Sequence, residues 1–471
     1  MKTLSRKAVG LAVAIALAGC ATVSPTLQPN VTAPAQWNDA AAQPSAPLST
    51  EWWSAFNSEE LKRLVDAALA DSPDLAIAAE RVRQAEAQVQ IAGASLFPVL
   101  DLGAGTSRRI TDREGRPSQR SDASNVSFSA SYELDVWGRN AANVRSADAS
   151  FRASAFDRDA ARLTLVAGVA TSYFEALSLR GRIAIARENL AIAKRVQSLV
   201  EVRARNGAAS QLDVERQQAQ VLSQRAALFP LEQLEKQTLA ALAVLIGRVP
   251  EGFDVKATSL ADLRIPEVNP GLPAELLVRR PDLAAAEAQV AAANGDLAVA
   301  RAALLPSIEL TGSAGISSAA LLSFLSGPQS AVSLALSLFQ PIFDAGRLRG
   351  QVILSESRER ELAEAYRKAI LSAFSDVEQA LVAVSRSAQR EALQMQVQES
   401  ARNALRLAEI RYREGADDLL TVLEAQRTLF QAQDQLASIR LDRLAGAVAL
   451  YKALGGGWTA ESAMLAARTA R

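Results

Sequence analysis

The chain contains an internal duplication, and this feature constrains its fold more than any other. Landmarks of different kinds recur at a constant offset of 208 residues: Pro73 and Pro281, Pro98 and Pro306, Gly138 and Gly346, Gly207 and Gly415, Gly247 and Gly455. One register shared by unrelated landmarks indicates two structural repeats. We place the repeats at residues 58–248 and 273–456, joined by a proline-rich linker at 249–272.

In each repeat the hydrophobic pattern changes from strand to helix at a glycine-arginine pair. Before Gly138-Arg139, apolar and polar residues alternate over 125–136, which predicts a strand with one apolar face. After the pair the period becomes helical, and no proline follows until Pro230. Gly346-Arg347 marks the same change in the second repeat, after an alternating segment at 332–338.

The helical patterns that follow are very long. They run over 139–205 and 346–413, and about 67 residues at about 1.5 Å per residue is roughly 100 Å, more than a globular core accommodates. Shorter helices are expected to return over 210–246 and 417–454. A break is expected near Phe229, because Pro230 interrupts the first of them.

Further elements complete each repeat in the order helix, two strands, long helix, shorter helix. Helices are expected from Pro73 to about Ser95 and from Pro281 to about Leu304, each ending before a proline. Val99–Ser107 predicts a weak strand, and Ser307–Ile316 predicts a strand in the second repeat. Ile110–Ser124 is rich in charged and small residues and predicts a polar loop.

The composition excludes several kinds of function. The chain has 51 basic and 51 acidic residues and no basic stripe, so we expect no nucleic-acid partner. It has no histidine, which closes most Ser-His, Cys-His and His-metal mechanisms. It also shows no P-loop pattern. We therefore expect no enzyme, no metal and no cofactor.

The N-terminus reads as an export signal. Lys2, Arg6 and Lys7 precede an apolar run at 8–18 that is too short to span a bilayer. The following Leu17-Ala18-Gly19-Cys20 resembles the lipobox of bacterial lipoproteins. This predicts a signal peptide at 1–19 and acylation of Cys20, the only cysteine.

The residues after Cys20 predict an extended anchor rather than a folded core. Residues 20–57 are expected to form an acylated tether, within which Trp52, Trp53 and Phe56 are expected to pack between elements. Ala21 in place of an aspartate favours the outer membrane over the inner one. Residues 457–471 are expected to form a loose C-terminal tail.

The predicted strands cannot form a closed wall within one chain. Four strands with one apolar face lie within 98–137 and 306–343, whereas membrane barrels begin at about eight strands. Three copies would supply twelve strands and, with two long helices and two stacked pairs each, twelve helical columns. The predicted fold is therefore mainly α with a transmembrane β-barrel, as a homotrimer with a 12-stranded barrel and a long α-helical barrel. The alternative is a lipid-anchored structural or adhesion coiled coil without a pore.

Several motifs together resemble one family. They are Leu17–Cys20, Glu51-Trp52-Trp53, Ser72–Leu75, Tyr132–Arg139, Arg279–Leu283, Pro341–Arg347 and Arg411–Gly415. With these motifs, the mature chain resembles the outer membrane factors of tripartite efflux pumps, the TolC/OprM-like family and its NodT-like lipoprotein branch. The resemblance implies a homotrimeric channel in the bacterial outer membrane that extends into the periplasm. It also implies docking to a periplasmic adaptor and an inner-membrane transporter, usually of the resistance-nodulation-division type, and passive conduction of their substrates.

The resemblance also implies that the helical tube narrows at its periplasmic tip, where the helical hairpins meet. The matching positions are the turns at Gly207 and Gly415 and the gate candidates Arg203, Arg205, Arg411, Tyr412, Arg413, Glu414, Asp417 and Asp418. Ion pairs between hairpins could hold the tip shut, and a carboxylate ring would favour cations. The alternative is that these are solvated turn charges, each worth under about 1 kcal/mol.

Overall fold

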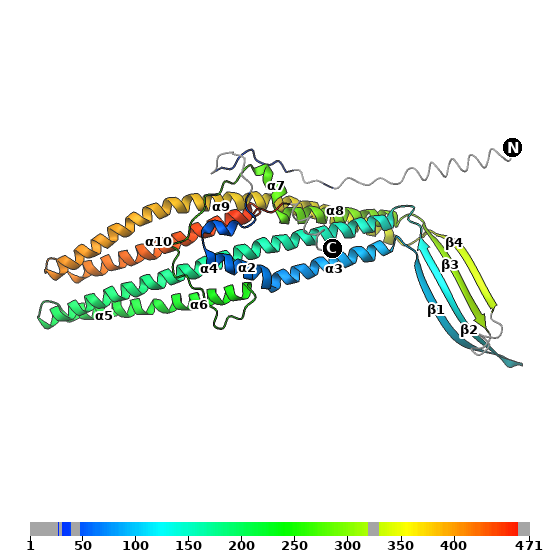
Figure 1. Ribbon diagram of the computed structural model, residues 1–471, viewed down its shortest axis with the longest axis horizontal. Coiled ribbons are helices and arrows are strands. Elements are labelled where there is room, and N and C mark those ends of the chain that lie inside the picture. Colours follow the sequence, from blue (N-terminus) through cyan, green and yellow to red (C-terminus); the bar gives the residue numbers. More distant parts are fainter. Residues whose placement is uncertain (1–26, 28–30, 39–47, 319–328, 460–471) are drawn as a thin grey trace. The chain divides into compact units, whose positions relative to one another are not determined.

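The computed structural model describes residues 27, 31–38, 48–318 and 329–459 (Figure 1). Cys20 and most of the predicted tail at 457–471 lie outside the described residues. The chain divides into two compact units. Among the described residues, one unit is drawn from Arg81–Ser154 and Ala285–Arg367, and the other from Val31–Glu80, Ala155–Ala284 and the residues from Lys368 onward.

The first unit contains one antiparallel sheet in the order β1-β2-β3-β4. Its strands are β1 (Val99–Arg113), β2 (Arg116–Glu133), β3 (Ser307–Ser318) and β4 (Gln329–Phe339). Because β2 pairs with β3, the sheet joins the strands of both repeats.

The predicted loop at Ile110–Ser124 is wrong, because β1 and β2 continue through it as a hairpin that turns at Glu114 and Gly115. Polar residues occupy both faces of this part of the hairpin, so the alternation that reveals a half-buried strand is missing from the sequence. The strand expected to reach Val136 ends at Glu133, where a last backbone bond from Leu134 N to Ile308 O (2.9 Å) precedes a turn.

The long helices α4 (Arg139–Arg205) and α9 (Arg347–Arg413) begin directly after glycines in the left-handed region, Gly138 (φ 72°) and Gly346 (φ 86°). An aspartate satisfies free amides at each start. Asp135 accepts hydrogen bonds from the amides of Asn140 and Ala141 at 2.9 and 2.8 Å, and Asp344 accepts one from Leu348 at 2.9 Å.

The two junction arginines differ in their contacts. Arg139 forms an ion pair with Glu133 at 2.5 Å. Arg347 is exposed and forms no ion pair with any residue that the structure describes. The indole of Trp137, beside the first junction, donates to Pro306 O at 2.6 Å and so ties this junction to the second repeat.

The remaining helices are η1 (Trp52–Phe56), α2 (Glu59–Asp71), α3 (Pro73–Ala94), α5 (Gln211–Ala226), α6 (Leu228–Leu245), η2 (Pro273–Glu275), α7 (Leu276–Arg279), α8 (Pro281–Ala302) and α10 (Leu419–Ala453). In the second unit, α4 with α5 and α9 with α10 form two helical hairpins (Figure 1). The expected break falls at Ala227, so Pro230 lies in the first turn of α6, where its missing amide costs nothing. Of the helices in the described ranges, none combines the length and hydropathy needed to cross a membrane.

The repeats reproduce each other at their helix ends. Gly247 (φ 71°) lies against the carbonyl of Asp71, and Gly455 (φ 85°) lies against the carbonyl of Arg279. Both the glycines and the residues that they touch are 208 positions apart. A side chain at either glycine would collide with that carbonyl, so each repeat requires the same close approach.

An aromatic core joins the two repeats within the second unit. Trp52 and Trp53 are 2% and 4% exposed, as predicted for packing between elements. Trp52 stacks on Tyr451 of α10 with ring centroids 5.1 Å apart, and Phe56 contacts Phe174 of α4 at 5.0 Å. Burial of large aromatic side chains therefore fixes η1 between α4 and α10.

The linker at 249–272 is packed rather than loose. Val255, Leu260 and Leu263 are buried against the same core as Trp52 and Phe174. Within the segment predicted as a tether, Trp37 is 2% exposed and its indole donates to Gly271 O at 2.9 Å. At this residue the predicted tether is part of the packed structure.

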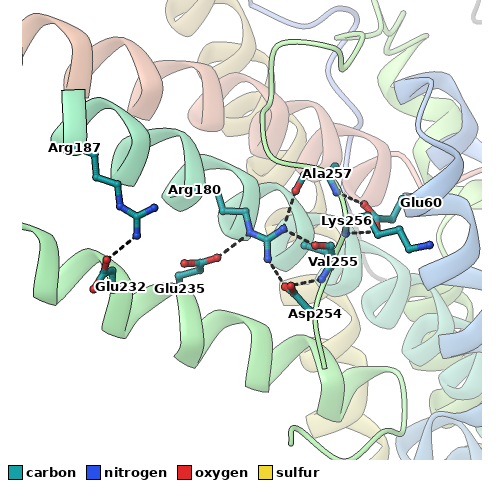
Figure 2. A network of polar contacts seen from close by, with 9 residues as sticks. All are labelled: Glu60, Arg180, Arg187, Glu232, Glu235, Asp254, Val255, Lys256 and Ala257. Atoms are coloured by element: carbon teal, nitrogen blue, oxygen red, sulfur yellow. Dashed lines mark hydrogen bonds and ion pairs between the residues drawn. The ribbon is translucent and has the colours of Figure 1, made fainter. Parts of the chain in front are cut away.

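One arginine fastens the linker to two helices. Figure 2 shows Arg180 of α4 reaching between Glu235 of α6 and the linker. Its guanidinium bonds Glu235 at 2.8 Å, the carbonyls of Val255 and Ala257 at 2.5 and 2.9 Å, and Asp254.

The same stretch of linker also binds a carboxylate. Glu60 of α2 accepts hydrogen bonds from the amides of Lys256 and Ala257 at 2.6 and 2.9 Å (Figure 2). The linker backbone is therefore held from both sides by charged groups, and hydrogen bonds to charged groups are the stronger kind.

We predict that Arg180→Ala frees the linker. The side chain is 15% exposed, and loss of its charged hydrogen bonds should cost on the order of 3 kcal/mol. Cleavage at Glu251 and Glu267 by a glutamate-specific protease should then accelerate by about a hundredfold, because cleavage follows the population of the opened linker.

Arg187→Ala is the matched control. Arg187 lies seven residues further along α4 and, among the residues that the structure describes, pairs only with Glu232; the two side chains are 64% and 38% exposed (Figure 2). Its loss should cost under about 1 kcal/mol and leave cleavage nearly unchanged. Equal cleavage of both variants would contradict the role assigned to Arg180.

Candidate functional site

The four-stranded sheet has two chemically different faces. One face is apolar and exposed, with Leu102 65%, Val332 84% and Leu334 77% accessible. The register places on this face Leu100, Leu102, Ala104, Val126, Phe128, Ala130, Tyr132, Ile308, Leu310, Ala314, Ile316, Val332, Leu334, Leu336 and Leu338. Large exposed apolar surfaces are rare on proteins surrounded by water.

The apolar face has the height of a bilayer core. Along β3 it extends over nine residues, from Ile308 to Ile316. A row of hydroxyl side chains bounds it, where Thr106 and Ser124 lie 3.1 Å apart and Ser124 pairs with Ser318. A tilted transmembrane strand needs about 9–11 residues, so the band matches the thickness of a hydrocarbon core.

The opposite face is hydrophilic and built from small residues. The register places on it Asp101, Gly103, Ser107, Ser127, Ser129, Ser131, Glu309, Thr311, Ser313, Gly315, Ser333 and Ser337, with Ala331, Ala335 and, at the end near the helices, Val99 and Phe339 as its apolar members. Hydroxyl groups meet across strands, as between Ser313 and Ser333 at 2.8 Å. Such a face suits contact with water.

The edges of the sheet are open. Within the described chain, β1 and β4 each pair with a strand on one side only. In lipid the unpaired N–H and C=O groups of an edge would each cost several kcal/mol. In lipid, such a sheet would therefore need further strands at both edges.

The hairpin turns reproduce each other. In the first, Gly207 (φ 72°) follows α4, and Ala208 N donates to Arg203 O at 2.8 Å. In the second, Gly415 (φ 78°) follows α9, and Ala416 N donates to Arg411 O at 2.8 Å. Both helices end in the same left-handed glycine cap.

One arginine connects the two turns. The Arg203 guanidinium lies 4.5 Å from the ring centroid of Tyr412 and also donates a hydrogen bond to Tyr412 O. A second nitrogen of Arg203 lies 3.4 Å from Ala208 O. Tyr412 is 4% exposed, so this cation–π contact is largely withdrawn from water.

The ion pair that the structure describes at the turns lies within the second hairpin. Arg411 bonds Asp417 at 2.6 and 3.1 Å, and this hydrogen bond holds the pKa of Asp417 below its usual value. Asp418 caps α10 by accepting from Thr421 N at 3.0 Å, which also lowers its pKa. Arg205, Arg413 and Glu414 are exposed and form no ion pair with the residues described here.

The structure therefore brings Arg203 together with Tyr412, and Arg411 together with Asp417. Sequence reasoning named all four residues but predicted neither of these two pairs. The available signal was that Tyr412 is aromatic at a turn where the other repeat has Ala204.

Comparison with known proteins identifies the family. A family model described as outer membrane efflux protein matches residues 64–248 and 272–456. The chain belongs to this family. Each match covers one repeat, which confirms the tandem duplication predicted from the 208-residue offset.

Individual relatives agree along their whole length. The chain is 44% identical to the pyoverdine export outer membrane protein OpmQ of Pseudomonas aeruginosa and 42% identical to OpmQ of Pseudomonas putida, covering 98–99% of this chain and 99% of each relative. A solved structure of the outer-membrane channel OprN has 29% identity and a TM-score of 0.84, over 92% of this chain and all of that one. The chain is thus an outer membrane efflux protein with the fold of known channels.

We predict that Arg203→Gln loosens the contact between the hairpin turns. Loss of a cation–π contact and a charged hydrogen bond should cost roughly 2 kcal/mol. If this contact closes the tip, the ratio of open to closed channels should rise by about thirtyfold, measured as current in planar bilayers.

Asp417→Asn serves as the control for the exposed pair. Arg411 is 60% exposed, so loss of its partner should change the current by under about fivefold. Because the pKa of Asp417 is lowered, any stabilisation by the pair is complete above about pH 4 and is lost only as pH falls through the lowered value. Wild-type current should therefore not respond to titration of this pair between pH 7 and pH 5. An unchanged current in Arg203→Gln would remove its contact from gating.

Proposed function

We propose that three copies of this chain close a 12-stranded β-barrel in the outer membrane and form a passive exit duct. The observation that carries this proposal is the sheet with an apolar band of bilayer height, a hydrophilic second face and two open edges. Pairing β4 of one copy with β1 of the next satisfies both edges and turns the hydroxyl-lined face inward. The duct needs no catalytic residue, since energy comes from elsewhere.

In the same proposal the helical part extends into the periplasm and joins a pump. The partners are a periplasmic adaptor and an inner-membrane transporter, of the resistance-nodulation-division type. The turns at Gly207 and Gly415 form the tip that meets them, with Arg203 and Tyr412 as the contact that holds the tip. Family membership supports these partners, because efflux across two membranes requires an energised component.

A pair of substitutions on adjacent residues of β4 tests the barrel. Leu336→Arg puts a charge on the apolar face, which should cost about 2–4 kcal/mol per subunit at mid-membrane and block insertion. Ala335→Arg puts the same charge on the opposite face, so the trimer should insert and conduct with altered ion selectivity. The measurements are outer-membrane fractionation and single-channel current. If the wild-type protein is monomeric and carries no current, the alternative of a structural coiled coil is favoured.

The cargo and the lipid anchor can be tested in one strain. The two OpmQ relatives are named for pyoverdine export, so we propose pyoverdine or a similar compound as cargo. Deletion of the gene should lower its export, and the wild-type gene should restore it. Complementation with Cys20→Ser should give protein that incorporates no labelled fatty acid. If deletion leaves pyoverdine export unchanged, the duct carries another cargo. If the Cys20→Ser protein still incorporates labelled fatty acid, Cys20 is not the lipid anchor.

A further inference from the structure

The β1–β2 hairpin extends beyond the apolar band as a two-stranded ribbon. The last row that it shares with β3 is Ser124↔Ser318, and its own pairing continues through Arg108↔Asp122 and Ile110↔Arg120. Five arginines fall within residues 108–120, at Arg108, Arg109, Arg113, Arg116 and Arg120, against two acidic residues, Asp112 and Glu114. An isolated two-stranded ribbon is marginally stable in water, so this ribbon would gain from a further contact.

The register assigns the arginines to faces. Pairing runs without interruption from Val99↔Ser131 to Thr111↔Gln119, so side chains alternate strictly along this stretch. Arg108 and Arg120 therefore share the face of Leu102 and Phe128. Arg109 lies on the opposite face, with Ser107.

The two arginines on the apolar side differ in their contacts. Arg108 makes two hydrogen bonds to Asp122, at 2.8 and 2.9 Å, which fix the ribbon where it leaves the band. Arg120 forms no hydrogen bond or ion pair within the described part of the chain, although its charge also acts on Asp122 and helps to lower the pKa of that carboxyl. Arg109, on the opposite face, likewise forms neither within the described residues. Ile110, paired with Arg120, is 54% exposed. With Asp122 bonded to Arg108, the face carries one positive charge in excess, at Arg120, beside an apolar side chain.

The height of this cluster corresponds to the head-group region. Arg108 lies two residues beyond Thr106 and Ile110 lies four beyond, which at about 3.4 Å per residue and a tilt of about 45° is roughly 5–10 Å above the band. Head groups occupy the layer about 5–8 Å thick outside the hydrocarbon core. Arginine side chains are long enough to reach back toward that layer.

We propose that Arg120 and Ile110, on a ribbon fixed by the Arg108–Asp122 pair, bind phosphorylated head groups of the outer-leaflet lipids. Guanidinium groups match phosphate in a bidentate geometry, and Ile110 contacts the apolar part of the lipid. The binding site rests on the proposed barrel, because only a barrel in the membrane brings this face to the lipid. It adds an anchor for the barrel on the side opposite the periplasm.

The experiment compares two arginines on opposite faces of one ribbon. Purified wild-type protein and the variants Arg120→Gln and Arg109→Gln are reconstituted in phosphatidylcholine vesicles containing bisphosphorylated lipid A or its dephosphorylated form, re-extracted, and examined by native mass spectrometry. Wild type should retain the phosphorylated lipid and not the dephosphorylated one. Arg120→Gln should retain about tenfold less, and Arg109→Gln should match wild type.

Two results would overturn the proposal. An equal loss of bound lipid in both variants would show that the positive charge matters but the face of the ribbon does not. That result is expected for diffuse electrostatic attraction or for a surface that binds an extracellular macromolecule. Equal retention by Arg120→Gln and wild type would show that the lipid binds elsewhere or not at all. Channel current is recorded on the same samples to separate the lipid site from the barrel. If Arg120→Gln conducts and still retains the phosphorylated lipid, the proposed site is refuted but the barrel is not. If the wild-type protein carries no current, the barrel itself is refuted.

Discussion

The hydrogen-bonding groups at the edges of the sheet set the requirement on which the rest of the architecture depends. β1 and β4 end a sheet whose exposed side chains on one face are leucine, isoleucine, valine and phenylalanine. In water the edge groups could be hydrated, but exposure of the apolar face would be unfavourable. In lipid the apolar face is favourable, but the edge groups have no hydrogen-bond partner. In the proposed barrel, closure shared with other copies resolves this conflict. The duplication is useful here because β2 pairs with β3, which gives each copy a four-stranded segment instead of two separate hairpins.

The elements with strong periodicity were predictable from sequence. The limits of α4 at Arg139 and Arg205 follow from a glycine before the helix, a glycine after it, and no proline between them. The C-terminal ends of α6 and α10 follow in the same way, from Gly247 and Gly455 just beyond them. In these segments local signals and tertiary packing agree, which is why reading the pattern is sufficient.

The features that the sequence concealed depend on contacts between distant residues. The ribbon at 107–123 has polar side chains on both faces, so only its pairing register reveals it as strand. Burial of Trp37 depends on a carbonyl at Gly271, more than two hundred residues away. Likewise, Arg203 and Tyr412 belong to different repeats, and no spacing rule within one helix would bring them together. Charges at the turns were easy to notice, but their partners were not.

The break at Ala227 makes the two halves of the chain unequal in a way that matters for assembly. The first hairpin returns through two helices, α5 and α6, whereas the second returns through the single helix α10 of 35 residues. A ring of three such chains would offer six grooves of two alternating kinds, not six equal ones. A docking protein made of identical modules would therefore have to seat them in two distinct environments, and its own pairing of modules into dimers would be the simplest way to match that alternation.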